Sequence, residues 1–320
     1  MTQLVSLVMR RCAFLATDRL LSQRHGSSVR DFDRNSNKTV IFCARDAHVT
    51  LGYTGRAYLD GIPSDTFIAQ SLLGADLPNG IACIGRPAGW TDIGRSVDRL
   101  RLRLSEAFER LPEAERTEPF QIVLVGWRER RRDLRIAPII WELKKRSSCE
   151  FVIERFRRHW AWDRGYTMTT APDGEPQIFE QIRREIRSRA VHESPETLIQ
   201  ALVRGLKEYA NARPTTVGTA SLIALLTPFN SPHARIRFVP DTRNPSSTAD
   251  AVETFSPWIV APPMAWSPAR TTTTGGPGGF TSTGTGYSWV IEGPAQRPGP
   301  RRVSHSSQKR PPDPQRFRRR

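Results

Sequence analysis

The chain begins Met1-Thr2-Gln3-Leu4-Val5-Ser6-Leu7-Val8, a threonine followed by a short apolar run. Removal of Met1 would make Thr2 the terminal residue, carrying both a hydroxyl and a free α-amino group. A hydroxyl is a weak nucleophile, and a neighbouring terminal amine can act as its general base. Basic residues follow the apolar run, at Arg10-Arg11, instead of preceding it, so no signal peptide is expected. The start of the chain therefore predicts a threonine nucleophile.

Short apolar stretches predict strands on both sides of a polar segment. Residues 3–9 and 12–17 are expected to form one strand pair, and residues 39–44 and 48–51 a second. The polar stretch 22–37 between them predicts a loop. Later strands are expected at 121–127, 136–143, 150–156, 216–226, 234–239, 255–260 and 287–291.

Apolar residues at helical spacing predict helices between these groups of strands. The segment 92–111 has an apolar residue at every third or fourth position, and its arginines 95, 99, 101 and 103 are expected to face solvent. Further helices are expected at 66–73, 176–188 and 195–211. Strand pairs separated by paired helices favour an α+β fold with antiparallel sheets covered by helices, arranged as a four-layer αββα sandwich.

Charge and composition divide the chain unevenly. Its 320 residues carry a formal net charge of +16, and residues 293–320 contribute half of it, with nine Lys or Arg against one Asp. We expect one domain over residues 1–262, a Gly/Thr-rich β extension or loop over 263–292, and a disordered, basic Pro/Arg-rich tail over 293–320. Such a tail would contact polyanions non-specifically.

The four cysteines lack the spacing of a zinc site, and the six histidines form no metal-binding pattern. Cys12, Cys43 and Cys149 adjoin predicted strands, where buried free thiols are expected. No phosphate-binding glycine loop and no apolar run of 18 residues is present. We therefore expect no metal, no cofactor and no membrane span, and a reducing, cytoplasmic setting.

Five segments resemble the N-terminal-nucleophile hydrolases of the proteasome β-subunit type and their bacterial heat-shock protease relatives. More closely, the chain is similar to uncharacterised bacterial proteins of that fold. The similarity covers roughly residues 2–240. The segments that carry it are Met1–Val8, Phe14–Arg19, Asn37–Ile41, His48–Gly55 and Thr216–Ile223.

The resemblance implies roles for four residues. Thr2 would be the nucleophile, and Asp18 matches an acidic residue that the family places sixteen positions later. Lys38 matches a lysine that opens the third strand. Gly52 matches a glycine in a turn after the fourth strand, whose backbone N–H forms the oxyanion hole. These roles imply a threonine amidohydrolase acting on a peptide or a small amide, with a peptidase as one form of this activity. The family also implies assembly into a ring or a dimer.

Some features depart from the family pattern. The turn at Arg10-Arg11 lacks the usual glycine, the segment from Asp18 to Lys38 is long, and a later family serine that supports the terminal amine has no match. Asp18 and Lys38 are equally interpretable as a plain ion pair, and Gly52 and Gly55 as turn glycines with positive φ.

Two other functions therefore stay open. One is a catalytically inactive scaffold or binding module of the same fold. The other is a basic, nucleic-acid-associated protein, in which the tail and the arginines and aromatics of 157–162 bind phosphates and bases.

Overall fold

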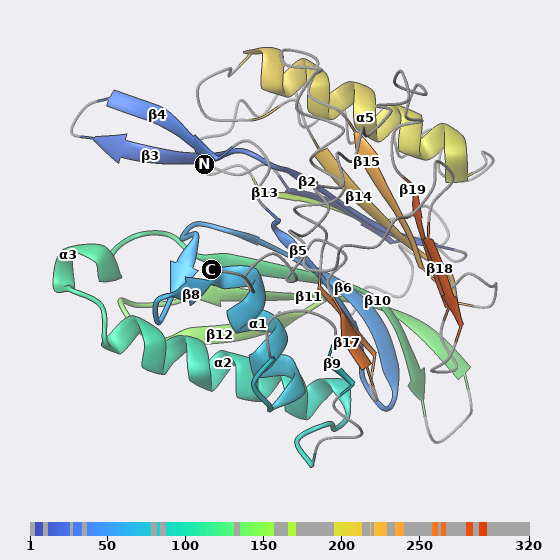
Figure 1. Ribbon diagram of the computed structural model, residues 1–320, viewed down its shortest axis with the longest axis horizontal. Coiled ribbons are helices and arrows are strands. Elements are labelled where there is room, and N and C mark those ends of the chain that lie inside the picture. Colours follow the sequence, from blue (N-terminus) through green and yellow to red (C-terminus); the bar gives the residue numbers. More distant parts are fainter. Residues whose placement is uncertain are drawn as a thin grey trace, which may run out of the picture.

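The computed structural model describes residues 4–8, 12–25, 28–33, 37–77, 82–83, 88–130, 135–156, 166–170, 195–212, 218, 221–228, 234–239, 258–261, 264–266, 280–283 and 288–292. Its described helices are α1 (Ser64–Leu73), α2 (Ile93–Glu109), α3 (Glu113–Arg116) and α5 (Pro195–Ala212). Most of the other described residues are in strands, so the expected mixed α+β class is confirmed (Figure 1).

One sheet has seven strands in the order β13-β1-β2-β14-β15-β19-β18. Neighbouring strands are antiparallel except β15 and β19, which are parallel. In chain order the members are β1 (Leu4–Val8), β2 (Ala13–Asp18), β13 (Tyr166–Thr170), β14 (Ser221–Leu226), β15 (Ala234–Val239), β18 (Phe280–Thr283) and β19 (Ser288–Glu292).

The other large sheet has eight strands in the order β12-β11-β10-β6-β5-β16-β17-β9. Only β5 and β16 are parallel neighbours. In chain order the members are β5 (Thr39–Cys43), β6 (Ala47–Thr54), β9 (Ala82–Cys83), β10 (Gln121–Arg130), β11 (Arg135–Lys145), β12 (Phe151–Arg155), β16 (Trp258–Ala261) and β17 (Met264–Trp266). A further small sheet pairs β7 (Tyr58–Leu59) with β8 (Ile62–Pro63).

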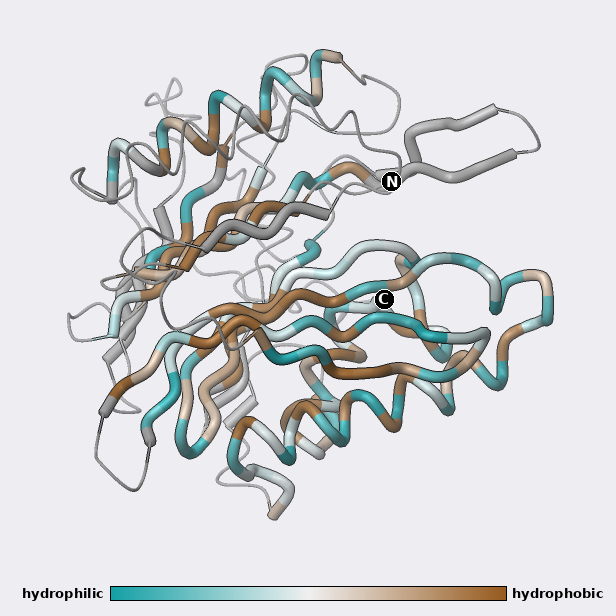
Figure 2. The backbone as a smooth tube through the Cα atoms, turned by 180° about the vertical axis from the view of Figure 1, so that it is seen from behind, coloured by the Kyte–Doolittle hydropathy of each residue, from teal (hydrophilic) through white to brown (hydrophobic). Residues whose placement is uncertain are grey.

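Three separate apolar clusters form the core. One packs the eight-stranded sheet against α1 and α2, as in the buried residues Leu51 and Leu100. A second joins the two large sheets, and a third packs the seven-stranded sheet against α5. Strand β2 shows the alternation that this requires, because Leu15 belongs to the second cluster whereas Phe14 and Ala16 belong to the third. The helices lie on the outer sides of the two sheets (Figure 1), and the strands of both sheets carry most of the hydrophobic colour (Figure 2).

Helix α2 confirms the predicted helix at 92–111, but one of its arginines does not face solvent. The guanidinium of Arg99 donates hydrogen bonds to the carbonyls of Ser71 (2.7 Å), Leu72 (2.5 Å) and Gly89 (2.8 Å). Ser71 and Leu72 belong to the last turn of α1, whose carbonyls lack partners within the helix. Arg99 therefore caps α1 and ties the two helices together.

The loop expected at 22–37 is wrong. The chain instead forms a two-stranded ribbon of β3 (Leu21–His25) and β4 (Ser28–Asp33), which extends from the body (Figure 1). Its sequence is polar because the ribbon is not part of either large sheet, so no apolar alternation reveals it.

The helix expected at 195–211 is confirmed by α5. The strand expected at 234–239 is present with the predicted ends, and the other strands expected before and after α5 are present with different bounds. Three strands lie within 263–292: β17 belongs to the eight-stranded sheet, and β18 and β19 belong to the seven-stranded sheet. The division of the chain into domains stays a prediction. The expected turn at 10–11, helix at 176–188 and tail at 293–320 lie outside the described residues. No helix in the described part of the chain is long and apolar enough to span a membrane.

Candidate active site

A buried ion pair joins the two large sheets at the ends of two inner strands. Asp18 is the last residue of β2 in one sheet, and Lys38 directly precedes β5 in the other. The Lys38 Nζ atom lies 3.2 Å from each carboxylate oxygen of Asp18 and 2.5 Å from the carbonyl oxygen of Leu20. Asp18 is 0% exposed and Lys38 is 1% exposed. The predicted contact between these two residues is therefore present.

The backbone also stabilises the Asp18 carboxylate. Its Oδ2 atom accepts hydrogen bonds from the backbone N–H groups of Leu20 at 3.2 Å and Gly218 at 3.4 Å. An ionised carboxylate only accepts hydrogen bonds, so a surrounding of N–H and ammonium donors suits the charged form. A buried ion pair is weak support for stability, because desolvation offsets the attraction. Its presence here leaves both a structural and a chemical role open.

Strand β1, which follows the predicted nucleophile Thr2 in the chain, begins beside this pair. Leu4, the first residue of β1, is the register partner of Thr17, and Asp18 follows Thr17. The Thr17 hydroxyl in turn lies 3.1 Å from the hydroxyl of Thr39, which follows Lys38. The beginning of β1, the end of β2 and the beginning of β5 thus meet at one place.

Thr2 itself lies outside the described residues. Thr2 is two residues from Leu4, which pairs next to Asp18. The contact of Thr2 with Lys38 therefore stays a prediction.

Gly52 is not in a turn, and this expectation is wrong. It lies inside β6, where its register partners are Thr39 on β5 and Val123 on β10. The N–H of Tyr53 donates to the Lys38 carbonyl on the β5 side at 3.2 Å. Successive N–H groups of a strand point to opposite sides, so the Gly52 N–H points toward Val123 within the sheet. It is not available to a developing oxyanion.

Glycine at position 52 leaves room for close packing between the sheets. A Cβ atom there would lie 2.5 Å from Leu4 Cδ1 and 3.0 Å from Leu15 Cδ2. Strand β6 continues to Thr54, three residues beyond the predicted strand end at Leu51. Gly52 therefore marks a close approach of the two sheets and not the predicted turn.

The first residue after β6 is another glycine, Gly55. Its φ of 110° is in the region that favours glycine, and a Cβ there would lie 2.3 Å from the carbonyl oxygen of Pro119. Gly55 is therefore the turn glycine that follows the strand. The predicted strand end at Leu51 is three residues too early, so the sequence pattern indicated Gly52 as the turn glycine instead of Gly55.

The described thiols do not form a rival nucleophile. Cys12 and Cys43 are free and buried, as predicted, and burial raises the pKa of both thiols to about 12. A thiol with that pKa stays protonated and unreactive at neutral pH. Cys149 is also free and is half-buried, whereas the side chain of Cys83 lies outside the described part. Among the described residues, no three His, Cys, Asp or Glu side chains are grouped to hold a metal ion.

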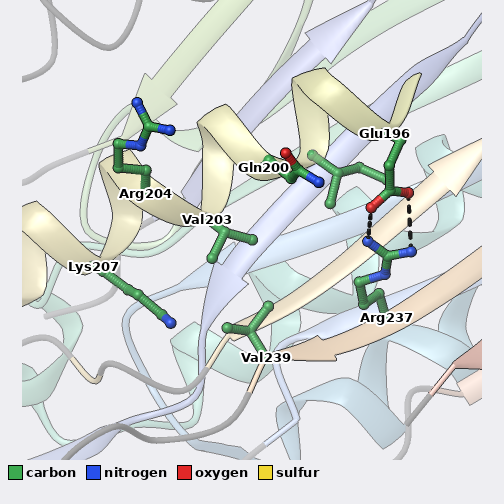
Figure 3. Close-up of a pocket in the computed structure, with 8 residues that line it drawn as sticks. Glu196, Gln200, Val203, Arg204, Lys207, Arg237 and Val239 are labelled. Atoms are coloured by element: carbon green, nitrogen blue, oxygen red, sulfur yellow. Dashed lines mark hydrogen bonds and ion pairs between the residues drawn. The ribbon is translucent and has the colours of Figure 1, made fainter. Parts of the chain in front are cut away.

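A second charged region lies in a groove between α5 and β15 (Figure 3). The groove has a volume of about 460 Å³, and its lining includes Val203 on α5 and Val239 on β15. Across it, the Nη1 and Nη2 atoms of Arg237 each donate a hydrogen bond to one carboxylate oxygen of Glu196. These hydrogen bonds lower the pKa of Glu196 below its ordinary value of 4.5. The pair ties α5 to β15 at the protein surface.

Comparisons with known proteins leave the chain without an assigned family. No protein-family model matches it, and no curated protein matches it. Among solved structures, the chain is similar to "Anbu (Gly-1) mutant from Hyphomicrobium sp. strain MC1", with a TM-score of 0.46 and 11% sequence identity. The similarity covers 78% of this chain and 96% of that one. A likeness at this TM-score adds no weight to any functional assignment, which must rest on contacts within the chain itself.

Proposed function

We propose that the chain is a threonine-type N-terminal-nucleophile hydrolase that cleaves an amide bond in a peptide or a small amide. The observation that carries this proposal is the buried Asp18–Lys38 pair beside the start of β1, two residues from Thr2. The three apolar clusters support the four-layer αββα sandwich that such a hydrolase would have, with α5 outside one sheet and α1 and α2 outside the other.

The proposed reaction begins when the Thr2 hydroxyl oxygen attacks the amide carbonyl carbon. The Thr2 α-amine takes the hydroxyl proton, directly or through one water, and returns it to the leaving nitrogen. The Lys38 ammonium keeps positive charge beside the hydroxyl and favours its deprotonation. Asp18 and the Leu20 carbonyl hold that ammonium in place. A water molecule then hydrolyses the ester formed on Thr2 and releases the acid.

The turn at Gly55, and not Gly52, supplies the oxyanion donor in this proposal. Tyr53, two residues before Gly55, donates its N–H to the Lys38 carbonyl, so the turn follows the part of β6 that lies beside Lys38. A backbone N–H directed at a developing oxyanion is worth about 3–4 kcal/mol.

The test combines intact-protein mass with an electrophile that reacts with an N-terminal threonine. We expect loss of Met1 and one adduct per chain on Thr2, with adduct formation abolished by Lys38→Ala. The matched control is Lys207→Ala in the groove beside α5, which should react like the unaltered protein. A retained Met1, or equal reaction of both lysine variants, would contradict the proposal.

An inactive binding module of the same fold is the second candidate. The specific observation that favours it is the completeness of the Lys38 contacts, since a fully buried ammonium held by Asp18 and Leu20 is also a good structural link between sheets. This candidate predicts that Met1 is removed but Thr2 is unreactive.

A further inference from the structure

The residue before Lys38 forms an unusual set of hydrogen bonds. The side-chain amide of Asn37 donates from Nδ2 to the carbonyl of Thr39 at 3.0 Å and accepts at Oδ1 from the N–H of Thr39 at 3.2 Å. One side chain thus holds both backbone polar groups of the residue that follows Lys38. Asparagine commonly bonds the backbone two residues onward, though usually through one group only.

The sheet explains why Thr39 needs this partner. Lys38 uses its carbonyl toward β6, so the N–H and C=O of Thr39 point to the opposite side. The neighbour on that side is β16, whose described residues pair from Trp258 onward, with Trp258 opposite Val40. Thr39 is fully buried, and unpaired backbone groups there would cost free energy. The Asn37 amide therefore gives both of these backbone groups a hydrogen-bond partner at the beginning of β5.

Two more contacts fix Asn37 itself. Its Nδ2 atom also donates to Oδ2 of Asp65 at 2.8 Å, and its backbone carbonyl accepts a hydrogen bond from the Tyr53 hydroxyl at 3.0 Å. Asp65 is in the first turn of α1, where its other oxygen accepts from the N–H of Thr66 at 2.8 Å. We call Asn37, Thr39, Tyr53 and Asp65 the Asn37 bracket. It fixes the backbone on both sides of Lys38 and links it to α1.

We propose that Asn37 is a positioning residue for Lys38, and that Asp65 couples the first turn of α1 to the same site. This inference rests on the proposed hydrolase function. A lysine side chain has four rotatable bonds, so a fixed backbone on both sides narrows the positions that its ammonium can reach. Asn37 contacts no substrate in this account, and acts only through where it holds the Lys38 charge relative to the nucleophile.

A merely structural bracket and a positioning bracket make different predictions. If the bracket only supports the fold, its loss lowers the unfolding temperature and leaves the chemistry of Thr2 unchanged. If it positions Lys38, its loss moves a positive charge relative to the Thr2 amine. The apparent pKa in the pH–rate profile of Thr2 modification would then shift.

The test uses Asn37→Ala in the full chain, with Asn211→Ala on the exposed end of α5 as the matched control. We expect Asn37→Ala to slow adduct formation on Thr2 by about tenfold to a hundredfold, as small misplacements do, and to shift the midpoint of its pH–rate profile. Asn211→Ala should change neither. Tyr53→Phe, which removes a single hydrogen bond from the bracket, should produce a smaller shift in the same direction and serves if Asn37→Ala does not fold.

A second readout separates this inference from the proposed function. A buried, fixed ammonium exchanges its protons slowly, so ¹⁵N-labelled Lys38 should give a distinct side-chain NMR signal, assigned by its loss in Lys38→Met. We expect that signal to broaden or disappear in Asn37→Ala. If Thr2 is inert in the unaltered protein, the hydrolase proposal fails while the lysine signal still tests the bracket. An unchanged lysine signal together with an unchanged pH–rate profile would overturn the inference.

Discussion

Two of the ion pairs among the described residues lie in opposite surroundings. Asp18 and Lys38 are buried where the two large sheets meet, whereas the side chains of Glu196 and Arg237 are 49% and 31% exposed in the groove beside α5. Water can solvate either member of the exposed pair after its partner is removed. Water does not reach Asp18 or Lys38, so neither is solvated after its partner is removed. Residues of both large sheets fix the geometry of this pair. Of these two ion pairs, the buried one combines a high cost of disruption with the fixed geometry that catalysis requires.

The largest expected effect comes from removing one member of the buried pair. Lys38→Met leaves the Asp18 carboxylate buried without a cation, and we expect the free energy of unfolding to fall by about 3–5 kcal/mol. Urea unfolding at neutral pH measures this. The control is Lys207→Met, for which we expect a change within about 0.5 kcal/mol. Equal losses in the two variants would remove the contrast between the two regions.

Neutralising both members should recover most of that loss. In Asp18→Asn with Lys38→Met no charge is left unpaired, and the asparagine oxygen can still accept from the backbone N–H of Leu20. Buried ion pairs replaced by uncharged groups often cost little. A double variant as unstable as Lys38→Met alone would show that the cost lies in packing and not in charge.

The contact between the sheets below the buried pair gives the next largest effect. In Gly52→Ala the new Cβ would lie 2.5 Å from Leu4 Cδ1, and overpacking of this kind costs about 1–3 kcal/mol. Adding Leu4→Val should relieve part of the loss, because the two positions share one space. Thermal unfolding of the single and double variants measures the coupling. Additive losses would contradict the close approach of the sheets.

The exposed pair should give the smallest effect, and one that depends on pH. Glu196→Gln should cost about 0.2–1 kcal/mol at neutral pH, the usual range for exposed pairs. The pKa of Glu196 is lowered in the fold by the hydrogen bonds from Arg237, so its contribution is present above the ordinary pKa of 4.5 and is lost as the pH falls through the folded pKa. Urea unfolding of both proteins at neutral pH and near pH 3 should show the difference shrinking at low pH. A constant difference would mean that the charge is not its cause.

The sequence predicted the elements whose apolar period faces a core. Helices α2 and α5 and the central strands of both sheets bury regular apolar positions, so their pattern identifies them. The ribbon of β3 and β4 and the short strand β13 escaped prediction, because each depends on a backbone partner and not on apolar alternation. Local pattern does not report such long-range pairing.

The candidate site was predictable only in part, for a similar reason. The contact of Asp18 with Lys38 was implied by the family resemblance, and it is present. Gly52 was misplaced because a glycine inside a strand and a glycine in a turn look alike in sequence. The Asn37 bracket could not be predicted, since Asn37 and Asp65 come from separate segments that only the folded chain brings together.

The most direct test of the central claim is the rate of Thr2 modification in the charge-free double variant, Asp18→Asn with Lys38→Met, once unfolding has shown that it folds. The buried pair, if it activates Thr2, should make the unaltered protein form one Thr2 adduct per chain at least about a hundredfold faster than this variant. Equal rates in two folded proteins, with Met1 removed from both, would show that the pair is a structural link and that the hydrolase assignment is wrong.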